Sequence, residues 1–168
     1  MAAEIAFLQL LVSLRQPLLD EIAVSITALG SPVFVLVTVA SLYLFREKEA
    51  SLIVLSGAVV AGILEKSINL LVARPRPDLP YLFESAGMGS SFPSGHATIA
   101  FLLATVLYRE YGRPAFLFTL AGLVAVSRLY IGVHYPSDVI AGALLGAGTG
   151  VLVLRYRAEL LSRLKRYI

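Results

Sequence analysis

The chain has 168 residues, of which 58% are apolar and 15% are charged, with a net charge of +3 and a mean hydropathy of +0.82. Soluble domains are usually about 45–50% apolar and about 25% charged, so this composition excludes an ordinary soluble protein and predicts an integral membrane protein. The absence of cysteine excludes a disulfide framework and a cysteine-based zinc site. The length, with no internal repeat and no long linker, predicts one domain over residues 1–168.

The apolar stretches, taken in chain order, predict an all-α bundle of about six transmembrane helices. Residues 5–14 carry apolar side chains at helical spacing, and we expect a short interfacial helix there. Residues 18–29 are short for a crossing, and we expect them to form a hairpin with the next helix through Gly30. A spanning helix needs about 20 apolar residues, and the other stretches near that length are 32–45, 50–73, 96–111, 114–131 and 137–156.

The last of these stretches contains small residues at a regular interval. Gly142, Gly146 and Gly150 are spaced four apart, which places them on one face of a helix. Small residues at such spacing let a neighbouring helix backbone approach closely within a membrane. We therefore expect this helix to pack tightly against a neighbour.

Basic residues divide unevenly between the two sides of the predicted bundle. Cytoplasmic loops of membrane proteins carry an excess of Lys and Arg, which predicts that both termini lie on the cytoplasmic side of a prokaryotic inner membrane. The far side, facing the outside or periplasm, receives only Lys66, Arg74, Arg76 and Arg128. The cytoplasmic side receives Arg15, Arg46, Lys48, Arg109, Arg113, Arg155, Arg157, Arg163, Lys165 and Arg166.

The four far-side cations fall in three short segments that also hold the chain's two histidines. These segments are Lys66–Pro77 at one helix end, Pro93–His96 at the next helix start, and Ser127–Asp138 across a later helix end and start. A helix that ends at one membrane face and the helix that follows the next loop share that face. The three segments can therefore converge on one pocket.

The residue types of this pocket suit phosphoryl transfer. Clustered guanidinium groups repel one another unless an anion lies among them, and their planar forks of donors fit phosphate oxygens. Ser94 is placed to cap a helix start, where free N–H groups favour an anion, and Gly95 allows close backbone approach. No carboxylate cluster indicates a metal, so we expect metal-independent chemistry with no cofactor.

Two histidines divide the expected chemical work. Asp138 follows His134 by four residues across Pro136, so we expect its carboxylate to orient the imidazole and leave one ring nitrogen free to attack phosphorus. His96, from the opposite wall, is placed to protonate the leaving oxygen as a general acid.

These segments resemble the three signature motifs of the phosphatidic acid phosphatase type 2 superfamily, whose soluble relatives include vanadium haloperoxidases. The second motif, PSGH, is intact at residues 93–96. The third, SR-x5-H-x3-D, is intact as Ser127, Arg128, His134 and Asp138. The resemblance implies that His134 forms a phosphohistidine, that His96 is the acid, and that the phosphate ligands are Arg76, Ser94, Gly95 and Arg128.

The first family motif, K-x6-R-P, is not intact. Counting back from Arg76-Pro77 places Asn69 where the family has lysine, and Lys66 lies three residues earlier on a similar helix face. Lys66 is therefore expected to reach the phosphate from one turn away, and the division of labour between Arg74 and Arg76 stays open.

The ionisable pair Glu65 and Lys66 lies inside an apolar stretch, where charge is costly and often functional or paired between helices. Tyr81 and Phe83, in the loop before Pro93, are expected to be membrane-interface anchors.

The function favoured by this pattern is a membrane lipid phosphatase. Candidate substrates are undecaprenyl diphosphate, phosphatidylglycerol phosphate, phosphatidic acid and a lipid A phosphate, and the expected partners are membrane lipids rather than nucleic acid. The alternatives are a vanadate-dependent peroxidase-like enzyme and a non-catalytic membrane lipid-binding protein or transporter. Headgroup, monophosphate or diphosphate preference, and oligomeric state stay open.

Overall fold

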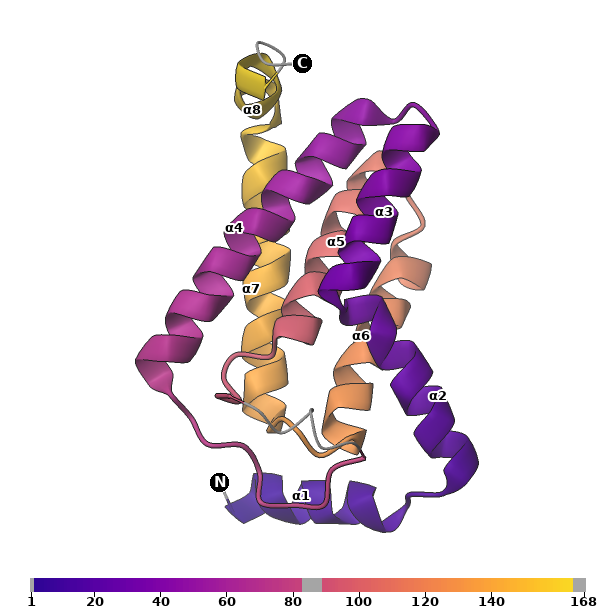
Figure 1. The fold of residues 1–168 in the computed structure, drawn as a ribbon, viewed down its shortest axis with the longest axis vertical. Helices are drawn as coiled ribbons and strands as arrows, with labels where there is room; N and C mark the ends of the chain where they lie inside the picture. The colour runs from indigo at the N-terminus through magenta and orange to yellow at the C-terminus, as the bar shows by residue number, and fades with distance from the viewer. Residues whose placement is uncertain (1, 83–88, 165–168) are drawn as a thin grey trace.

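The structure is a computed structural model that describes residues 2–82 and 89–164 of the chain. Every regular element in these ranges is a helix (Figure 1). The long helices begin and end within two residues of the bounds expected from the sequence. The elements are α1 (Ala2–Ser13), α2 (Pro17–Thr27), the 3-10 turn η1 (Ala28–Gly30), α3 (Pro32–Leu44), α4 (Lys48–Val72), α5 (Gly95–Tyr111), α6 (Pro114–Tyr130), α7 (Pro136–Arg155) and α8 (Arg157–Leu164).

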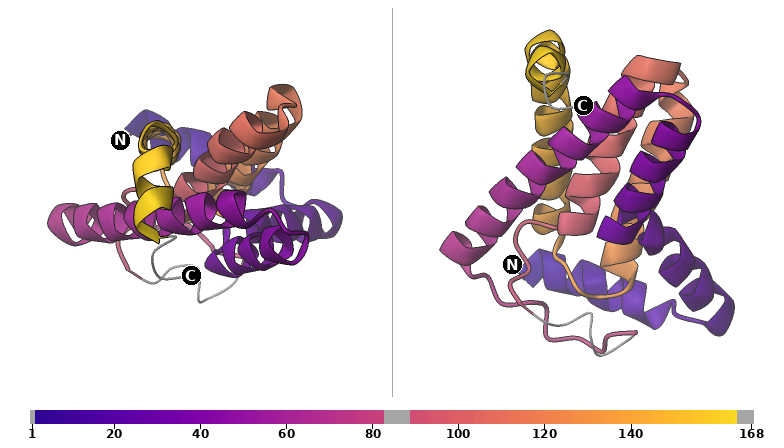
Figure 2. Two further views of the ribbon diagram at one scale, coloured as in Figure 1. Left: turned by 90° about the horizontal axis from the view of Figure 1, so that it is seen from above. Right: turned by 45° about the horizontal axis from the view of Figure 1, so that its top comes forward.

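The helices α2 to α7 form a bundle with α5 at its centre. α1 lies across one end of the bundle and α8 lies at the other, as the right-hand view of Figure 2 also shows. The loop between α4 and α5, and the turn between α6 and α7, lie at the end that α1 covers. We call this the α1 end and the other the α8 end.

α2 and α3 do not form the hairpin expected from the sequence. At the α1 end, Asp20 of α2 accepts a hydrogen bond from Tyr130, and Thr27 accepts one from Arg128. α3 continues in the same general direction toward the α8 end, where it meets α4 (Figure 1). α2 and α3 together therefore cross the bundle once, from the α1 end to the α8 end, and this first passage is interrupted at η1.

Local chemistry explains this break. Ser31 is extended and its side chain accepts a hydrogen bond from Phe34 N–H, so it caps a new helix that starts at Pro32. Gly30 lies so close to α5 that a Cβ there would be 2.7 Å from the His96 carbonyl oxygen. The Gly-Ser-Pro sequence therefore breaks the helix without reversing the direction of the chain.

The first and last helices, α1 and α8, consequently lie at opposite ends of the bundle, whereas the sequence predicts both termini on one side. Glu4 of α1 contacts Ser137 and Arg74 at the α1 end. Arg157 of α8 pairs with Glu49 and Glu110 at the α8 end.

Length and hydropathy support a membrane bundle. In the described part of the chain α4 and α7 are long and apolar enough to span a bilayer, and α1 with α2, bent by 119°, passes the same test as a pair. α3 and α6 are shorter apolar helices. Large apolar side chains are exposed on the outside of the bundle, as a lipid-facing surface requires, among them Val33, Leu36, Leu71, Ile140 and Leu144. The predicted all-α membrane bundle is confirmed.

The backbones of α5 and α7 are in close contact along the glycine face of α7, as expected. A Cβ at Gly142 would lie 2.4 Å from the Ser94 carbonyl oxygen, and one at Gly146 would lie 2.0 Å from that of Thr98. Only glycine fits at such separations. This packing brings the first turns of α5 and α7 together, where Ser94 N–H donates to the Asp138 carbonyl at 3.0 Å.

We predict that Gly146→Leu destabilises the protein because the new side chain forces α5 away from α7. Overpacking costs about 1–3 kcal/mol where neighbours are able to move, and here the neighbour is backbone, so we expect at least that loss. Thermal unfolding in detergent measures it.

Gly148→Leu is the matched control, because a Cβ at Gly148 meets nothing within 4 Å. Equal unfolding temperatures for the two variants would contradict the proposed role of the glycine face.

Candidate active site

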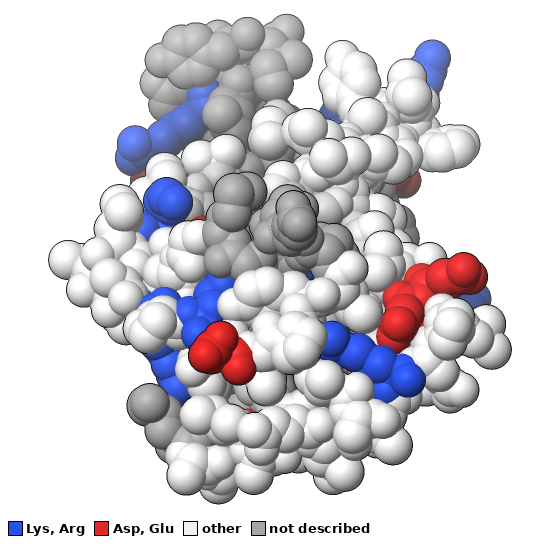
Figure 3. Space-filling view, turned by 60° about the horizontal axis from the view of Figure 1, so that its bottom comes forward, with Lys and Arg blue, Asp and Glu red and all other residues white. Residues whose placement is uncertain are grey.

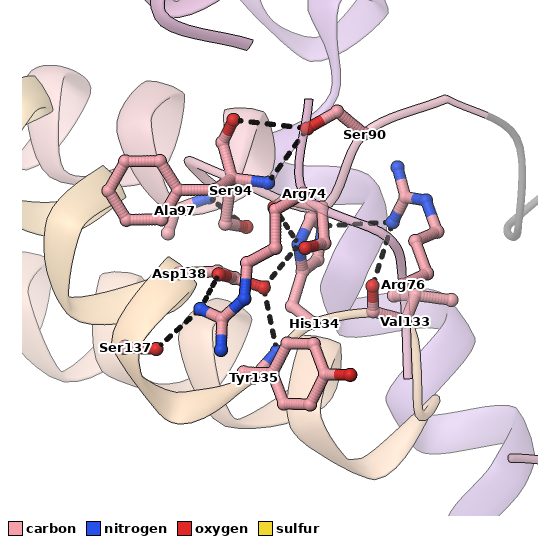
Figure 4. Close-up of polar contacts among 12 residues, drawn as sticks. Arg74, Arg76, Ser90, Ser94, Ala97, Val133, His134, Tyr135, Ser137 and Asp138 are labelled. Carbon is pink, nitrogen blue, oxygen red and sulfur yellow. Dashed lines mark hydrogen bonds and ion pairs between the residues drawn. The ribbon is translucent and has the colours of Figure 1, made fainter. Parts of the chain in front are cut away.

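The three predicted segments meet at the α1 end of the bundle (Figure 4). The close-up shows side chains from the loop after α4, from the start of α5 and from the turn before α7 directed toward one another. Seen from this end, basic side chains lie among mostly uncharged surface with a few acidic groups beside them (Figure 3). The three segments thus lie at the same end of the bundle, as the order of helices in the sequence predicts.

His134 lies in the turn between α6 and α7 and is 4% exposed. Its Nδ1 is 2.7 Å from the Ser91 carbonyl oxygen. A carbonyl only accepts, so Nδ1 carries the hydrogen and Nε2 is the free, basic nitrogen. Burial lowers the pKa of His134 to about 4, and the nearby Arg128 and Arg76 act in the same direction. The imidazole is therefore neutral at neutral pH.

Asp138 lies in the first turn of α7 and is fully buried. Its carboxylate accepts hydrogen bonds from Tyr135 N–H at 2.8 Å and from Arg74 at 2.6 Å. The closest approach to His134 Nδ1 is 3.8 Å, which is longer than a hydrogen bond. The structure thus brings the expected pair together, but the hydrogen bond on Nδ1 goes to Ser91, and Asp138 acts on the imidazole mainly through its charge.

Arg74 is directed at the start of α7. It donates to Asp138 and to Ser137 Oγ at 2.7 Å, lies 3.4 Å from Glu4, and stacks 4.0 Å above the Tyr135 ring. Its charge is balanced by two carboxylates, so Arg74 holds the site together.

Arg76 lies beside the free nitrogen of His134. Its Nη1 donates to the Val133 carbonyl at 2.8 Å and is 3.5 Å from His134 Nε2, while its Nε donates to the Gly89 carbonyl at 3.2 Å. This geometry distinguishes the two motif arginines, because Arg76 lies beside His134 Nε2 and Arg74 contacts Asp138.

Arg128, in the last turn of α6, is 5% exposed. Its Nη1 donates to Thr27 Oγ1 at 3.0 Å, but its Nε is buried and has no hydrogen-bond partner among the residues that the structure describes. A buried donor without a partner is costly, and a charged one more so. Arg128 and Arg76 also lie close enough to His96, in the first turn of α5, for their charges to act on it.

The start of α5 supplies backbone donors to the same place. Ser94 is fully buried, is extended, and accepts from Ala97 N–H at 3.5 Å as the cap of α5. The first amides of a helix have no acceptor within that helix, so they are available to an anion. Gly95 and His96 are the first two residues of α5.

Lys66 lies next to Glu65, and its charge acts on that carboxyl group. Lys66 is exposed on α4, and no hydrogen bond or ion pair to it occurs among the described residues. Asn69, at the motif lysine position, donates to the carbonyls of Ser90 and Phe92 at 3.2 and 3.4 Å and so supports the loop before α5. The neighbour of Lys66, Glu65, faces the site instead, because a Cβ on Gly95 would lie 3.5 Å from its carboxyl group.

Sequence reasoning missed several supporting residues. Glu4 of α1 accepts hydrogen bonds from Ser137 N–H at 3.0 Å and Ser137 Oγ at 2.7 Å, and it contacts Arg74. Thr27 and the Ser91 carbonyl were also not anticipated. None of these belongs to a periodic pattern or a motif, so no sequence signal marked them.

Tyr81 is packed rather than free at the interface. It donates to the Pro77 carbonyl at 2.8 Å and lies against the apolar cluster of Ala23, Ile131 and Val133. Phe83 lies outside the described residues. Within the described part of the chain, no three His, Asp or Glu side chains gather as metal ligands would.

The fold and site define a membrane protein with an arginine-rich, two-histidine pocket, and comparison with known proteins identifies its family. Residues 49–161 match the PAP2 superfamily model. The chain belongs to the PAP2 superfamily, which confirms the resemblance read from the motifs.

Named relatives are similar over most of the chain. Decaprenylphosphoryl-5-phosphoribose phosphatase of Mycobacterium tuberculosis is 35% identical over 153 residues, which cover 85% of this chain and 86% of the relative. Phosphatidylglycerophosphatase B of Bacillus subtilis is 32% identical over 162 residues, covering 86% and 78%.

Solved structures agree with this assignment. The crystal structure of Aquifex aeolicus LpxE matches with a TM-score of 0.78 and 33% identity, over 90% of this chain and 94% of that one. The transmembrane PAP2-type phosphatidylglycerolphosphate phosphatase of Bacillus subtilis matches with a TM-score of 0.83 and 28% identity, over 94% and 86%.

We predict that Glu4→Ala lowers kcat/KM about tenfold, because Arg74 and Ser137 lose a common acceptor and the start of α7, with Asp138, becomes less fixed. One charge-assisted hydrogen bond is worth about 1.5–3 kcal/mol, and tenfold corresponds to about 1.4 kcal/mol. Steady-state phosphate release measures the effect.

Glu159→Ala is the control, since Glu159 lies on α8 at the far end, where it pairs with Arg163. Wild-type activity in Glu4→Ala would show that α1 does not support the site.

Proposed function

We propose that this protein is a membrane lipid phosphatase that transfers a phosphoryl group from a lipid to His134 and then to water. The observation that carries the proposal is the buried Arg128 Nε without a hydrogen-bond partner, beside Arg76 and both histidines. A desolvated guanidinium in such a place is stabilised by an anion, and phosphate oxygens match its donors. Membership of a superfamily whose named relatives are lipid phosphatases supports a lipid phosphate as that anion.

In the first step, Nε2 of neutral His134 attacks phosphorus. The bond from phosphorus to the lipid oxygen breaks, and that oxygen takes a proton from His96, whose protonated form is stabilised by the negative charge of the bound phosphate. The products are the dephosphorylated lipid and a phosphohistidine on His134. The Nδ1 hydrogen bond to Ser91 and the charge of Asp138 stabilise the imidazole as it becomes positive.

In the second step, water attacks the phosphohistidine. Neutral His96 accepts a proton from the water, the bond between Nε2 and phosphorus breaks, and inorganic phosphate leaves. His134 returns to its neutral form and His96 is protonated again, so the catalyst is restored. Arg76, Arg128 and the amides at the start of α5 stabilise charge on the phosphate oxygens in both steps. The reaction needs no metal ion.

The substrate is a phosphomonoester or diphosphate of a membrane lipid. The site lies at one end of a bundle with apolar outer faces, so a lipid lying in the bilayer is able to present its headgroup there. Named relatives act on decaprenylphosphoryl phosphoribose, phosphatidylglycerophosphate and, in Sulfolobus acidocaldarius, undecaprenyl diphosphate. The substrate of this protein is in the same chemical class.

The protein lies in the cytoplasmic membrane of a prokaryote with the α1 end, and therefore the site, facing outward. The positive-inside tendency supports this orientation after the topology is corrected. Arg15 moves to the α1 end, where it donates to carbonyls of Pro80 and Tyr130. The described basic residues at the α8 end are still the larger group: Arg46, Lys48, Arg109, Arg113, Arg155, Arg157 and Arg163.

We predict that His134→Asn abolishes turnover, with a loss of at least about 10³-fold, because no nucleophile is left. Asparagine keeps an N–H donor for the Ser91 carbonyl, so the fold is preserved. Purified protein in excess chelator is assayed for phosphate release, and rapid quench of wild type with labelled lipid phosphate should trap an acid-labile phosphoenzyme.

Unchanged thermal unfolding of His134→Asn controls for its fold. Residual turnover near wild type, or a phosphoenzyme that forms in the variant, would reject His134 as the nucleophile; loss of wild-type activity in chelator would reject metal-free chemistry.

Orientation is tested by introducing single cysteines, since the chain has none. Asp78→Cys, exposed at the α1 end, should be labelled by an impermeant maleimide in intact cells. Glu47→Cys, exposed at the α8 end, should be labelled only after permeabilisation. The reverse pattern would overturn the outward-facing site.

A further inference from the structure

A groove runs along the outside of the bundle between α3 and α6, with α5 as its floor. α3 packs against α4, and α6 packs against α5 and α2, so an opening is left over α5. The groove has a deep part of about 120 Å³ and a wider part of about 410 Å³. Phe34, Leu107 and Leu117 line both parts, so the two parts adjoin.

The deep part ends inside the bundle, short of the candidate active site. Its described lining is apolar throughout and includes the small side chains of Ala104 and Ala121, which leave space beside them. At its inner end η1 closes it, because a Cβ on Gly30 would lie 2.7 Å from both Val124 Cγ1 and the His96 carbonyl oxygen. A hydrocarbon chain in this groove therefore belongs to a lipid at the α8 end rather than to one whose headgroup is in the active site.

The wider part becomes polar toward the α8 end. It is lined there by the hydroxyl groups of Ser41 and Tyr111 and by Arg113. The Arg113 side chain is exposed and has no hydrogen bond or ion pair within the part of the chain that the structure describes. The carboxylates of Glu47 and Glu110 act on Tyr111, so an anion at this mouth is favoured beside Arg113. An apolar interior with a cationic mouth fits an amphiphile whose polar end is negative.

The length of the groove matches one lipid chain. Val124, at the inner end, lies about three turns of α6 from Arg113, which is about 16 Å at about 1.5 Å per residue. One leaflet supplies half of a hydrocarbon core of about 30 Å, so a chain along the groove extends from the headgroup level to the middle of the bilayer. Because a chain is as apolar in free lipid as against a helix, the charge at the mouth selects the lipid.

We propose that this groove binds one hydrocarbon chain of an anionic phospholipid from the leaflet at the α8 end, with the lipid phosphate beside Arg113. Basic side chains at a membrane surface attract anionic headgroups. The bound lipid lies at the other end of the bundle from His134, so it is a structural ligand and not a substrate. The inference is independent of the proposed phosphatase function.

The test uses the full chain, which has no tryptophan, in mixed bilayers of phosphatidylglycerol and phosphatidylcholine in which one or the other lipid is brominated. Phe116→Trp replaces an exposed aromatic side chain of the groove, and quenching of its fluorescence reports which lipid is in contact. We expect phosphatidylglycerol to bind about fivefold more strongly than phosphatidylcholine, as one basic side chain at a membrane surface provides. Arg113→Gln in this background should remove the preference.

Ala121→Leu fills the deep part of the groove and should also remove the preference, with thermal unfolding as the check on its fold. Arg109→Gln is the matched control, because Arg109 is exposed near the same end and does not line the groove, so the preference should stay as before. Val151→Trp, in place of Phe116→Trp, reports on a lipid-facing surface of α7 outside the groove and should show no preference.

Equal binding of the two lipids at Phe116→Trp would overturn the proposal. A preference that survives Arg113→Gln or Ala121→Leu, that falls equally in Arg109→Gln, or that is as large at Val151→Trp would overturn it as well, because the groove would then hold only the ordinary lipid that surrounds any membrane protein.

Discussion

The backbone of α5 lies against the backbone of α7 along three glycines, and the position of the site depends on that contact. Side-chain atoms at Gly142 or Gly146 would overlap carbonyl oxygens of α5. Because nothing separates the two helices, Ser94 N–H reaches the Asp138 carbonyl and the two first turns form a single wall. The positions of Ser94, which caps α5, and of Asp138 in α7 are thus fixed by a helix–helix contact that extends well beyond the site. Van der Waals packing of small residues is the main force available between helices in lipid.

Among the described residues of this wall the buried charged groups have protein partners, and one donor atom of Arg128 is left without a hydrogen bond. Asp138 is balanced by Arg74, which Glu4 of α1 supports. His134 is uncharged, and its Nδ1–H donates to the Ser91 carbonyl oxygen. Arg128 is the exception, because one of its donors is buried and unused. Because the supporting charges are paired and a buried guanidinium donor is unused, the arrangement suits an anion.

Much of this arrangement was accessible from the sequence, because apolar length and Gly-Pro breaks locate helices and the motifs mark residues whose chemistry is distinctive. The helix bounds, the convergence of three segments and the tight glycine face were all anticipated. The hairpin at Gly30 was wrong, since a Gly-Ser-Pro break is compatible with either a reversal or a kink, and only packing of η1 on His96 decides between them. Lys66 was expected at the phosphate, but helical spacing alone does not say which face of α4 meets α5, and Glu65 occupies that face. Glu4 and Thr27 act across more than 100 residues of sequence, beyond the reach of any local pattern.

The broken first passage has a mechanical consequence. α2 and α3 contain 11 and 13 residues, and at about 1.5 Å per residue they amount to about 36 Å of helix, more than the roughly 30 Å of a bilayer's hydrocarbon core. A straight helix of that length has to tilt to fit the bilayer, whereas a helix with a break can accommodate the extra length by bending at the break. Thr27 is the last residue before the break and is bonded to the Arg128 guanidinium. The half of the passage that touches the pocket is therefore held by a polar contact, and the half beyond η1 is held by apolar packing of Val35 against α4.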